Sequence, residues 1–194
     1  IEPKDNYLKK VKERCNEVGA LLILDEIQPG FGRTGKMFGH DHWGIKADVF
    51  SFAKGMASGY MPIAATVVKE HIFDAFYGET TELMHFRHIN TYGGHPVSAA
   101  VSLKNIDIVK QENLPANAEK MEKYIKNRLS EFADHPLVGD IRGRGLLLGI
   151  ELVTDKEKKT PVSLAQANGI LQNCIKEGVF LMRNGNTVPG LGNI

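Results

Sequence analysis

The order of apolar and polar residues predicts an α/β layer in the first part of the chain. Residues 4–18 repeat apolar side chains at steps of three and four positions, which predicts a helix that ends at Gly19. The predicted inner face of this helix carries Leu8, Val11 and Cys15. Short apolar runs then occur at residues 20–24, 49–53 and 63–68. Each run is typical of a buried strand, so a helix followed by strands predicts a parallel or mixed sheet.

The second half of the chain predicts helices followed by a smaller mixed region. Residues 97–132 are helical in pattern, with a second helix beginning near Pro115. The predicted apolar face of the first helix carries Ala99, Ala100, Leu103, Ile106 and Val109. From Leu137 onward, a turn-rich segment leads to a strand. The elements predicted there are a strand at 146–153, a helix from about Ser163 to Lys176 and a strand at 179–182. Together they predict a small α+β domain.

Composition and charge narrow the classes of partner. Hydrophobic residues make up 42% of the chain, charged residues 24%, and the formal net charge is +1. No charge block suggests nucleic acid or an anionic membrane, and no apolar run reaches the roughly 18 residues of a membrane span. The two cysteines do not form a CxxC pair, so no zinc or redox motif is indicated. We therefore expect a cytoplasmic protein whose partner is a small molecule or a second copy.

Two residues at predicted strand ends suggest chemistry. Asp25 ends the first predicted strand and Lys54 follows the second, and ligands of open α/β sheets bind at this carboxyl edge. The aspartate could hold a positive charge on a heterocycle, and a lysine of lowered pKa could act as a Schiff-base nucleophile. A structural ion pair, or two residues that never meet, explains the same two residues. His40 and His42 beside Asp41 lack a third ligand, so we predict no metal site.

Four motifs resemble the class III aminotransferases, which use pyridoxal 5'-phosphate (PLP). They read DEIQPGFGRTG at 25–35, DVFSFAKG at 48–55, NTYGGHP at 90–96 and RGRGLLLGIEL at 142–152. Their order is that of the family and they span most of the chain. The separation of Asp25 and Lys54, 54 − 25 = 29 residues, also agrees with the family.

The resemblance implies a role for each matching residue. Asp25 would pair with the protonated pyridine nitrogen of PLP, and Lys54 would form the Schiff base with the cofactor and later move protons. Gln28 would donate toward the phenolic oxygen of the ring, and Ile27 would pack on a ring face. Thr91 would bind the phosphate across a dimer interface, which implies a homodimer with shared active sites.

The resemblance also implies the fold. It predicts fold type I of the PLP-dependent transferases, the α/β fold of aspartate aminotransferase. Residues 1–99 would be part of the large PLP-binding domain, residues 100–136 connecting helices, and residues 137–194 an incomplete small C-terminal α+β domain. The chain would be the C-terminal portion of such an enzyme. The family's N-terminal part supplies the main phosphate-binding turn, so we expect residues 1–194 alone not to be a competent catalyst.

The implied reaction is transamination. An ω-amino acid or a similar amine donor would leave its nitrogen on the cofactor, and a keto acid, pyruvate or 2-oxoglutarate, would collect it. Two alternatives stay open. Aminomutases and racemases use the same aspartate and lysine, and a non-catalytic fragment would need neither.

Overall fold

The computed structural model describes residues 2–4, 6–79 and 83–183. Contacts between Cα atoms divide the chain into two units, residues 1–120 and residues 121–194. The domain boundaries predicted at 99/100 and 136/137 stay a prediction. The portion of the predicted small domain after residue 183 lies outside the described residues.

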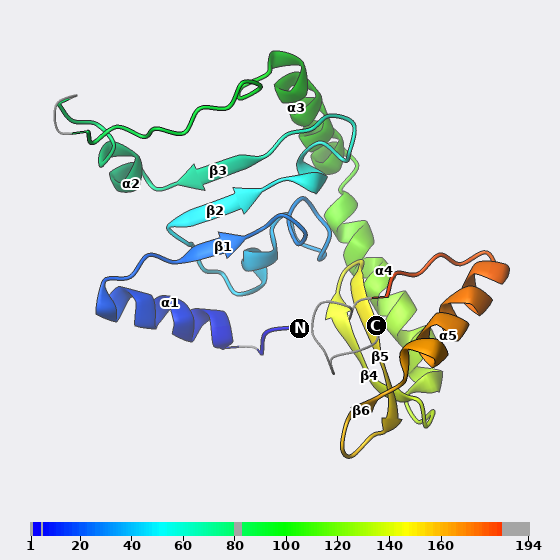
Figure 1. Cartoon of the computed structure of the whole chain (residues 1–194). Helices are drawn as coiled ribbons and strands as arrows, with labels where there is room; N and C mark the ends of the chain where they lie inside the picture. The colour runs from blue at the N-terminus through cyan, green and yellow to red at the C-terminus, as the bar shows by residue number, and fades with distance from the viewer. Residues whose placement is uncertain (1, 5, 80–82, 184–194) are drawn as a thin grey trace. The chain divides into compact units, whose positions relative to one another are not determined.

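A three-stranded mixed sheet forms the centre of the first unit (Figure 1). It consists of β1 (Ile23–Asp25), β2 (Val49–Phe52) and β3 (Ala65–Val68). β1 and β2 are parallel, and β3 is antiparallel to β2, which confirms the predicted mixed sheet. β1 begins later than the apolar run at 20–24. The backbone there is engaged elsewhere, because Ala20 N–H donates to Cys15 O and Leu22 O accepts from Asp48 and Val49.

Helix α1 (Tyr7–Val18) ends as predicted at Gly19. Gly19 has a φ of +69°, a left-handed conformation that glycine adopts at low cost. The buried core of this unit contains Leu22, Trp43, Ile45 and Ala47. The predicted helix face packs against it, through Leu8, Val11 and Cys15. This packing confirms the periodicity argument for α1.

The helices after the sheet are α2 (Glu70–Asp74), α3 (Pro96–Gln111) and α4 (Leu114–Leu129). The break between α3 and α4 confirms the second helix predicted near Pro115. α3 begins with Pro96 after His95, whose ring Nδ1 accepts from Ser98 N–H. A proline at the first helical position costs no hydrogen bond, because that N–H has no partner within a helix.

The predicted apolar face of α3 is confirmed only toward its C-terminal end. Val109 is buried and Ile106 half-buried, whereas Ala99 and Ala100 are exposed and the structure buries Ser98 and Ser102 instead. Leu103, predicted to be inside, is 66% exposed. α3 lies against the short 3-10 helix η2 (Lys54–Met56), whose backbone carbonyls need hydrogen-bond donors. The first part of α3 thus buries small polar side chains, which hydrophobic periodicity does not predict.

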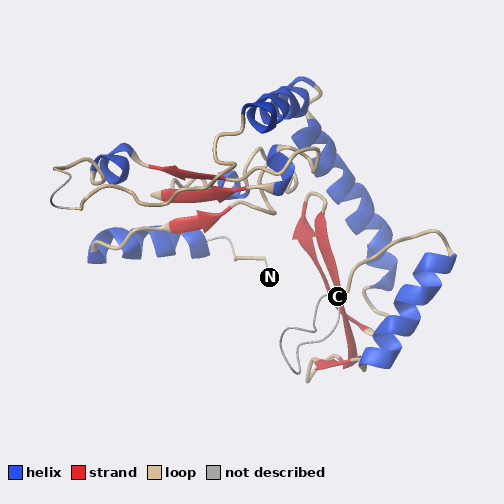
Figure 2. Cartoon of the chain, turned by 45° about the horizontal axis from the view of Figure 1, so that its top comes forward, coloured by secondary structure: helices blue, strands red, loops and turns tan. Residues whose placement is uncertain are grey.

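The second unit contains the last part of α4, an antiparallel sheet and a further helix (Figure 2). Its elements after α4 are η4 (Ser130–Phe132), β4 (Val138–Arg144), β5 (Leu147–Asp155), β6 (Thr160–Pro161) and α5 (Leu164–Lys176). The turn-rich segment predicted before the strand is in fact strand β4, because residues 138–144 pair with β5. Gly143 is required inside this strand: its φ is +130° and a Cβ would collide with the backbone of Leu147.

The last predicted helix is confirmed and the last predicted strand is not. α5 begins after Ser163, whose hydroxyl accepts from Gln166 N–H while the Gln166 side chain accepts from Ser163 N–H. Such reciprocal capping defines a helix start. Residues 179–182 are irregular. A strand needs a hydrogen-bonded neighbour, and no strand among residues 2–4, 6–79 and 83–183 pairs with them.

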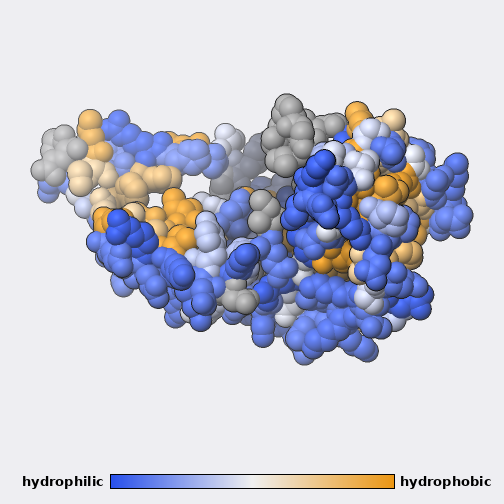
Figure 3. Space-filling view, turned by 90° about the horizontal axis from the view of Figure 1, so that it is seen from below, coloured by the Kyte–Doolittle hydropathy of each residue, from blue (hydrophilic) through white to orange (hydrophobic). Residues whose placement is uncertain are grey.

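Apolar side chains remain at the surface of the described chain, as the orange areas of Figure 3 show. In the first unit they include Leu21, Ile23, Phe76, Phe86, Ile89 and Tyr92. Where such side chains form a contiguous patch, that patch is a candidate surface for contact with other protein. Within the described part of the chain, no helix is both long and apolar enough to cross a membrane.

Candidate active site

The carboxyl ends of β1 and β2 bring two of the predicted residues to one edge of the sheet. Asp25 is the last residue of β1 and lies opposite Ser51 in the parallel register. Lys54 follows β2 at the start of η2. β1 and β2 are neighbours in the sheet. Asp25 and Lys54 therefore lie at the ends of two strands whose axes are about 4.8 Å apart. Both are exposed, as a ligand-binding position requires.

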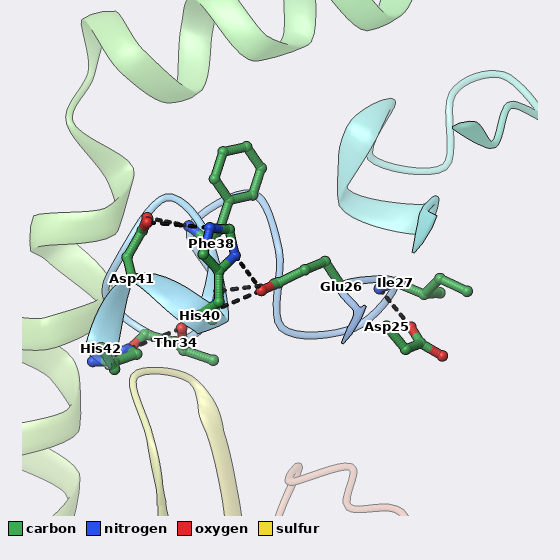
Figure 4. A network of polar contacts seen from close by, with 9 residues as sticks. Asp25, Glu26, Ile27, Thr34, Phe38, His40, Asp41 and His42 are labelled. Carbon is green, nitrogen blue, oxygen red and sulfur yellow. Dashed lines mark hydrogen bonds and ion pairs between the residues drawn. The ribbon is translucent and has the colours of Figure 1, made fainter. Parts of the chain in front are cut away.

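The Asp25 carboxylate is oriented by the turn that follows it. Its Oδ1 accepts a hydrogen bond from Ile27 N–H at 2.8 Å. This bond fixes the direction of the carboxylate without neutralising it. Ile27 is half-buried and Gln28 exposed within the same turn. Figure 4 shows the Asp25 side chain pointing away from that of Glu26, as alternation along a strand requires.

Lys54 has a left-handed backbone. Its φ is +43°, in a region that costs a non-glycine residue about 1–2 kcal/mol. The side chain of Asn105 on α3 donates to the two carbonyls that follow, Gly55 O at 2.8 Å and Met56 O at 3.1 Å. Such a conformation persists where the surroundings determine it.

Glu26 organises the loop beside this edge. Its side chain is 2% exposed, and its carboxylate accepts from Gly39 N–H, His40 N–H and His40 Nδ1, each at 2.8 Å (Figure 4). Its own N–H donates to Ser51 O on β2. Glu26 thus ties the loop at η1 (Gly39–His42) to both strands. Three hydrogen-bond donors compensate the buried Glu26 carboxylate, so its contacts hold the loop in place beside the sheet edge.

The two histidines of the loop have structural partners. His40 binds Glu26 and stacks on Phe38, with ring centroids 5.6 Å apart. The His42 Nε2 lies 3.0 Å from Thr34 O and 3.1 Å from Thr34 Oγ1. Among the residues that the structure describes, no group of three or more histidine, cysteine, aspartate or glutamate side chains could hold a metal.

Asp48 links the elements around the core. Its buried carboxylate binds Lys12 at 2.8 Å and Lys69 at 2.6 Å, and accepts from Leu22 N–H at 2.8 Å. The hydrogen bond from Lys12, then those from Lys69 and Leu22, hold the pKa of Asp48 far below its ordinary value. This carboxylate is therefore ionised at neutral pH and joins α1, β2 and the end of β3.

The described contacts do not join Thr91 to the strand ends. It begins the turn at residues 91–94 before α3 and is exposed. Within the described ranges of the chain, no hydrogen bond joins its side chain to Asp25 or Lys54. Its predicted role toward a phosphate across a dimer interface stays a prediction.

The sequence did not predict the structural roles of Glu26, Asp48 and Asn105. Glu26 and Asp48 lie inside the quoted motifs, and their position beside a buried strand was the available signal. Asn105 lies in the middle of a helix and has no local signal. Its partners lie 49 and 50 residues away.

The class of protein follows from a family match. The family described as Aminotransferase class-III matches residues 1–189, so the chain belongs to this family. The resemblance drawn from the four motifs is confirmed. So is the fold, because solved transaminases share this arrangement of helices and strands.

Individual relatives are longer than this chain. An uncharacterized aminotransferase, YhxA, of Bacillus subtilis is 45% identical over 194 residues, which are 100% of this chain and 43% of the relative. The taurine–pyruvate aminotransferase of Bilophila wadsworthia is 37% identical over 195 residues, which cover 100% of this chain and 43% of that protein. The crystal structure of a Bacillus anthracis aminotransferase superposes with a TM-score of 0.94 at 46% identity, over 100% of this chain and 43% of that one. The chain thus spans less than half the length of these relatives.

Proposed function

We propose that the protein containing this chain is a PLP-dependent aminotransferase. It would move an amino group from an ω-amino acid or a similar amine donor to a keto acid, pyruvate or 2-oxoglutarate. The observation that carries the proposal is the position of Asp25 and Lys54 at the ends of adjacent parallel strands. Membership of the class III family supports it independently.

The residues at this edge fit PLP. The exposed Asp25 carboxylate is oriented by Ile27 N–H through one oxygen, and its second oxygen would accept from a protonated ring nitrogen. One exposed primary amine on the next strand end matches the cofactor's aldehyde. When bound, PLP supplies an electron sink that stabilises negative charge at the substrate carbon.

The protein's own groups would do the rest. The Asp25 carboxylate would favour the protonated form of the ring nitrogen. The Lys54 amine would bind the cofactor's aldehyde and would carry a proton at the substrate carbon. Ile27 would contact the ring with an apolar side chain, and Gln28 would donate toward its phenolic oxygen. Thr91 of a second subunit would bind the phosphate in a homodimer.

The choice of substrates rests on the family and its members. The taurine–pyruvate aminotransferase named above supports an amine at the far end of the donor and pyruvate as acceptor. An aminomutase or racemase is the alternative, since Asp25 and Lys54 serve these reactions equally. We also expect a cytoplasmic location.

Borohydride trapping tests the cofactor and the lysine together. The product of the complete gene is supplied with PLP, reduced, digested and analysed by mass spectrometry. We expect a pyridoxyl group on Lys54, because reduction makes the link between cofactor and lysine permanent. Lys54→Ala should show no modification at this peptide.

Two further results would decide against the proposal. An unmodified Lys54 in folded, PLP-supplied protein removes the enzymatic interpretation and favours a non-catalytic fragment. Modification of Lys54 without transfer of nitrogen from any ω-amino donor to pyruvate or 2-oxoglutarate favours the aminomutase or racemase alternative.

A further inference from the structure

We propose that Asn105 is a positioning residue for Lys54: its side-chain amide fixes the backbone turn that directs the lysine amine. This inference rests on the proposed role of Lys54. It concerns α3, a helix that carries none of the residues assigned to the cofactor. Asn105 itself does not contact the reacting atoms, because its donors are occupied by backbone carbonyls.

The turn that carries Lys54 is unusual in its backbone. Lys54 has a φ of +43° and Ser58 a φ of +51°, both left-handed and both non-glycine. A lysine in the ordinary extended or helical region would point its side chain in another direction. The direction of the Lys54 amine is therefore set by a backbone conformation that lysine does not prefer.

Asn105 supplies the matching constraint from outside the turn. Its Nδ2 donates at 2.8 Å to Gly55 O and at 3.1 Å to Met56 O, the first two carbonyls after Lys54. A side-chain amide carries two N–H donors, and here two acceptors receive them. These carbonyls are thus held in one orientation, which restrains the peptide groups of Gly55 and Met56, the two residues that directly follow Lys54.

The opposite side of the turn is blocked by the loop. A Cβ at Gly55 would lie 3.1 Å from Phe31 Cβ and 3.4 Å from Gly30 O, so the turn lies close against this loop. On the α3 side, Ser98 and Ser102 are 4% and 3% exposed. Small side chains at these positions allow the helix to approach closely. The turn is held between Phe31 and Asn105.

The test uses the complete gene product with Asn105→Asp, which keeps the shape of the side chain and removes both donors. Asp107→Asn is the matched control, because Asp107 is exposed on the same helix. Total PLP content, the fraction linked to Lys54 after borohydride, and kcat and KM are measured at several pH values. Asn105→Ser, which keeps one donor, is studied in parallel.

We expect Asn105→Asp to retain PLP but to lose linkage to Lys54 at least about threefold, with kcat lowered about tenfold and KM little changed, since misplacement of a reacting group acts on kcat. The pH at which the absorption of the linked cofactor changes should shift. Asn105→Ser should be intermediate, and Asp107→Asn should behave as wild type.

Other outcomes overturn the inference. Wild-type linkage and pH profile in both Asn105 variants would show that the turn holds itself. Loss of linkage only in proportion to loss of folded protein, measured by circular dichroism in both variants, would show a purely structural role. An unlabelled Lys54 in the wild type is a different failure, because it rejects the proposed function before Asn105 is tested.

Discussion

Three acidic residues near the sheet have different environments and therefore different tasks. Asp25 is exposed and oriented by one backbone N–H. Glu26, the next residue, is buried and holds the loop at η1 through Gly39 and His40. Asp48 is buried between two lysines. A carboxylate left exposed at a strand end is available to a ligand, whereas satisfied buried carboxylates define the frame around it.

Asp48 should make stability depend on acid pH. Its pKa in the folded protein lies far below the ordinary value of 3.8, chiefly because Lys12 and Lys69 bind it. A lowered folded-state pKa contributes stability that is fully present above about pH 4 and is lost as pH falls below it. We expect Asp48→Asn to lower the free energy of unfolding at pH 7 by about 2 kcal/mol, the scale of hydrogen bonds to charged groups.

Urea unfolding of the complete protein at pH 7 and at acid pH measures this effect. The deficit of Asp48→Asn should shrink as pH falls, because the wild type loses its contribution there. Asp107→Asn, on an exposed position of α3, should change neither value by more than a few tenths of a kcal/mol. A deficit that is equal at both pH values would show that the ion pairs contribute nothing.

Among individual residues, the sequence predicts the positions of those whose neighbours in the chain reveal them. Asp25 and Lys54 could be placed at one edge because each follows a short apolar run. Asn105 could not be found, since its acceptors depend on how α3 packs on η2. The first part of the α3 face was misplaced because the helix buries Ser98 and Ser102 there, and hydrophobic periodicity does not register serine.

Helix ends were predictable because single residues encode them. Gly19 stops α1 in a left-handed conformation, and Ser163 caps α5 through a hydroxyl. Strands were harder to predict than helix ends, because a strand forms only when a neighbouring strand hydrogen-bonds to it. β4 was missed because Gly139 and Gly143 suggested turns. In the structure Gly143 pairs with Leu148 of β5, and Gly139 lies at an irregularity in the pairing. Residues 179–182 have the apolar run but no pairing in the described chain.

Replacing glycine by alanine should have opposite effects at the end of α1 and inside α5. Gly19 has a φ of +69° and open space around it, so Gly19→Ala costs only its conformational strain, about 1 kcal/mol. Gly169 lies inside α5, is exposed and also has open space. Gly169→Ala should stabilise by about 0.5–1 kcal/mol, the difference in helix propensity. Thermal unfolding measures both, and Gly19→Asn, which tolerates this backbone, should lose less than Gly19→Ala.

At the scale of the whole molecule, the exposed apolar surface has to be explained. Around the turn before α3, Ile89 is 92% exposed and Tyr92 is 83% exposed. Both flank Thr91, the residue predicted to bind a phosphate in a second subunit. Apolar side chains around a polar residue are typical of a protein interface. The surface is therefore compatible with the proposed shared active site, and a homodimer can be tested by mixing subunits.

Complementation between inactive subunits tests this arrangement. Lys54→Ala removes the amine, and Thr91→Glu would place a negative charge against the phosphate that Thr91 is predicted to bind, so each variant alone should be inactive. If Thr91 serves the partner's site, a mixed dimer has one intact site, and random mixing after unfolding and refolding restores about a quarter of wild-type activity. Mixing Lys54→Ala with Asp25→Asn is the control: both residues lie on the same sheet edge of one subunit, so no intact site forms. Equal failure of both mixtures would place Thr91 beside Lys54 of its own chain.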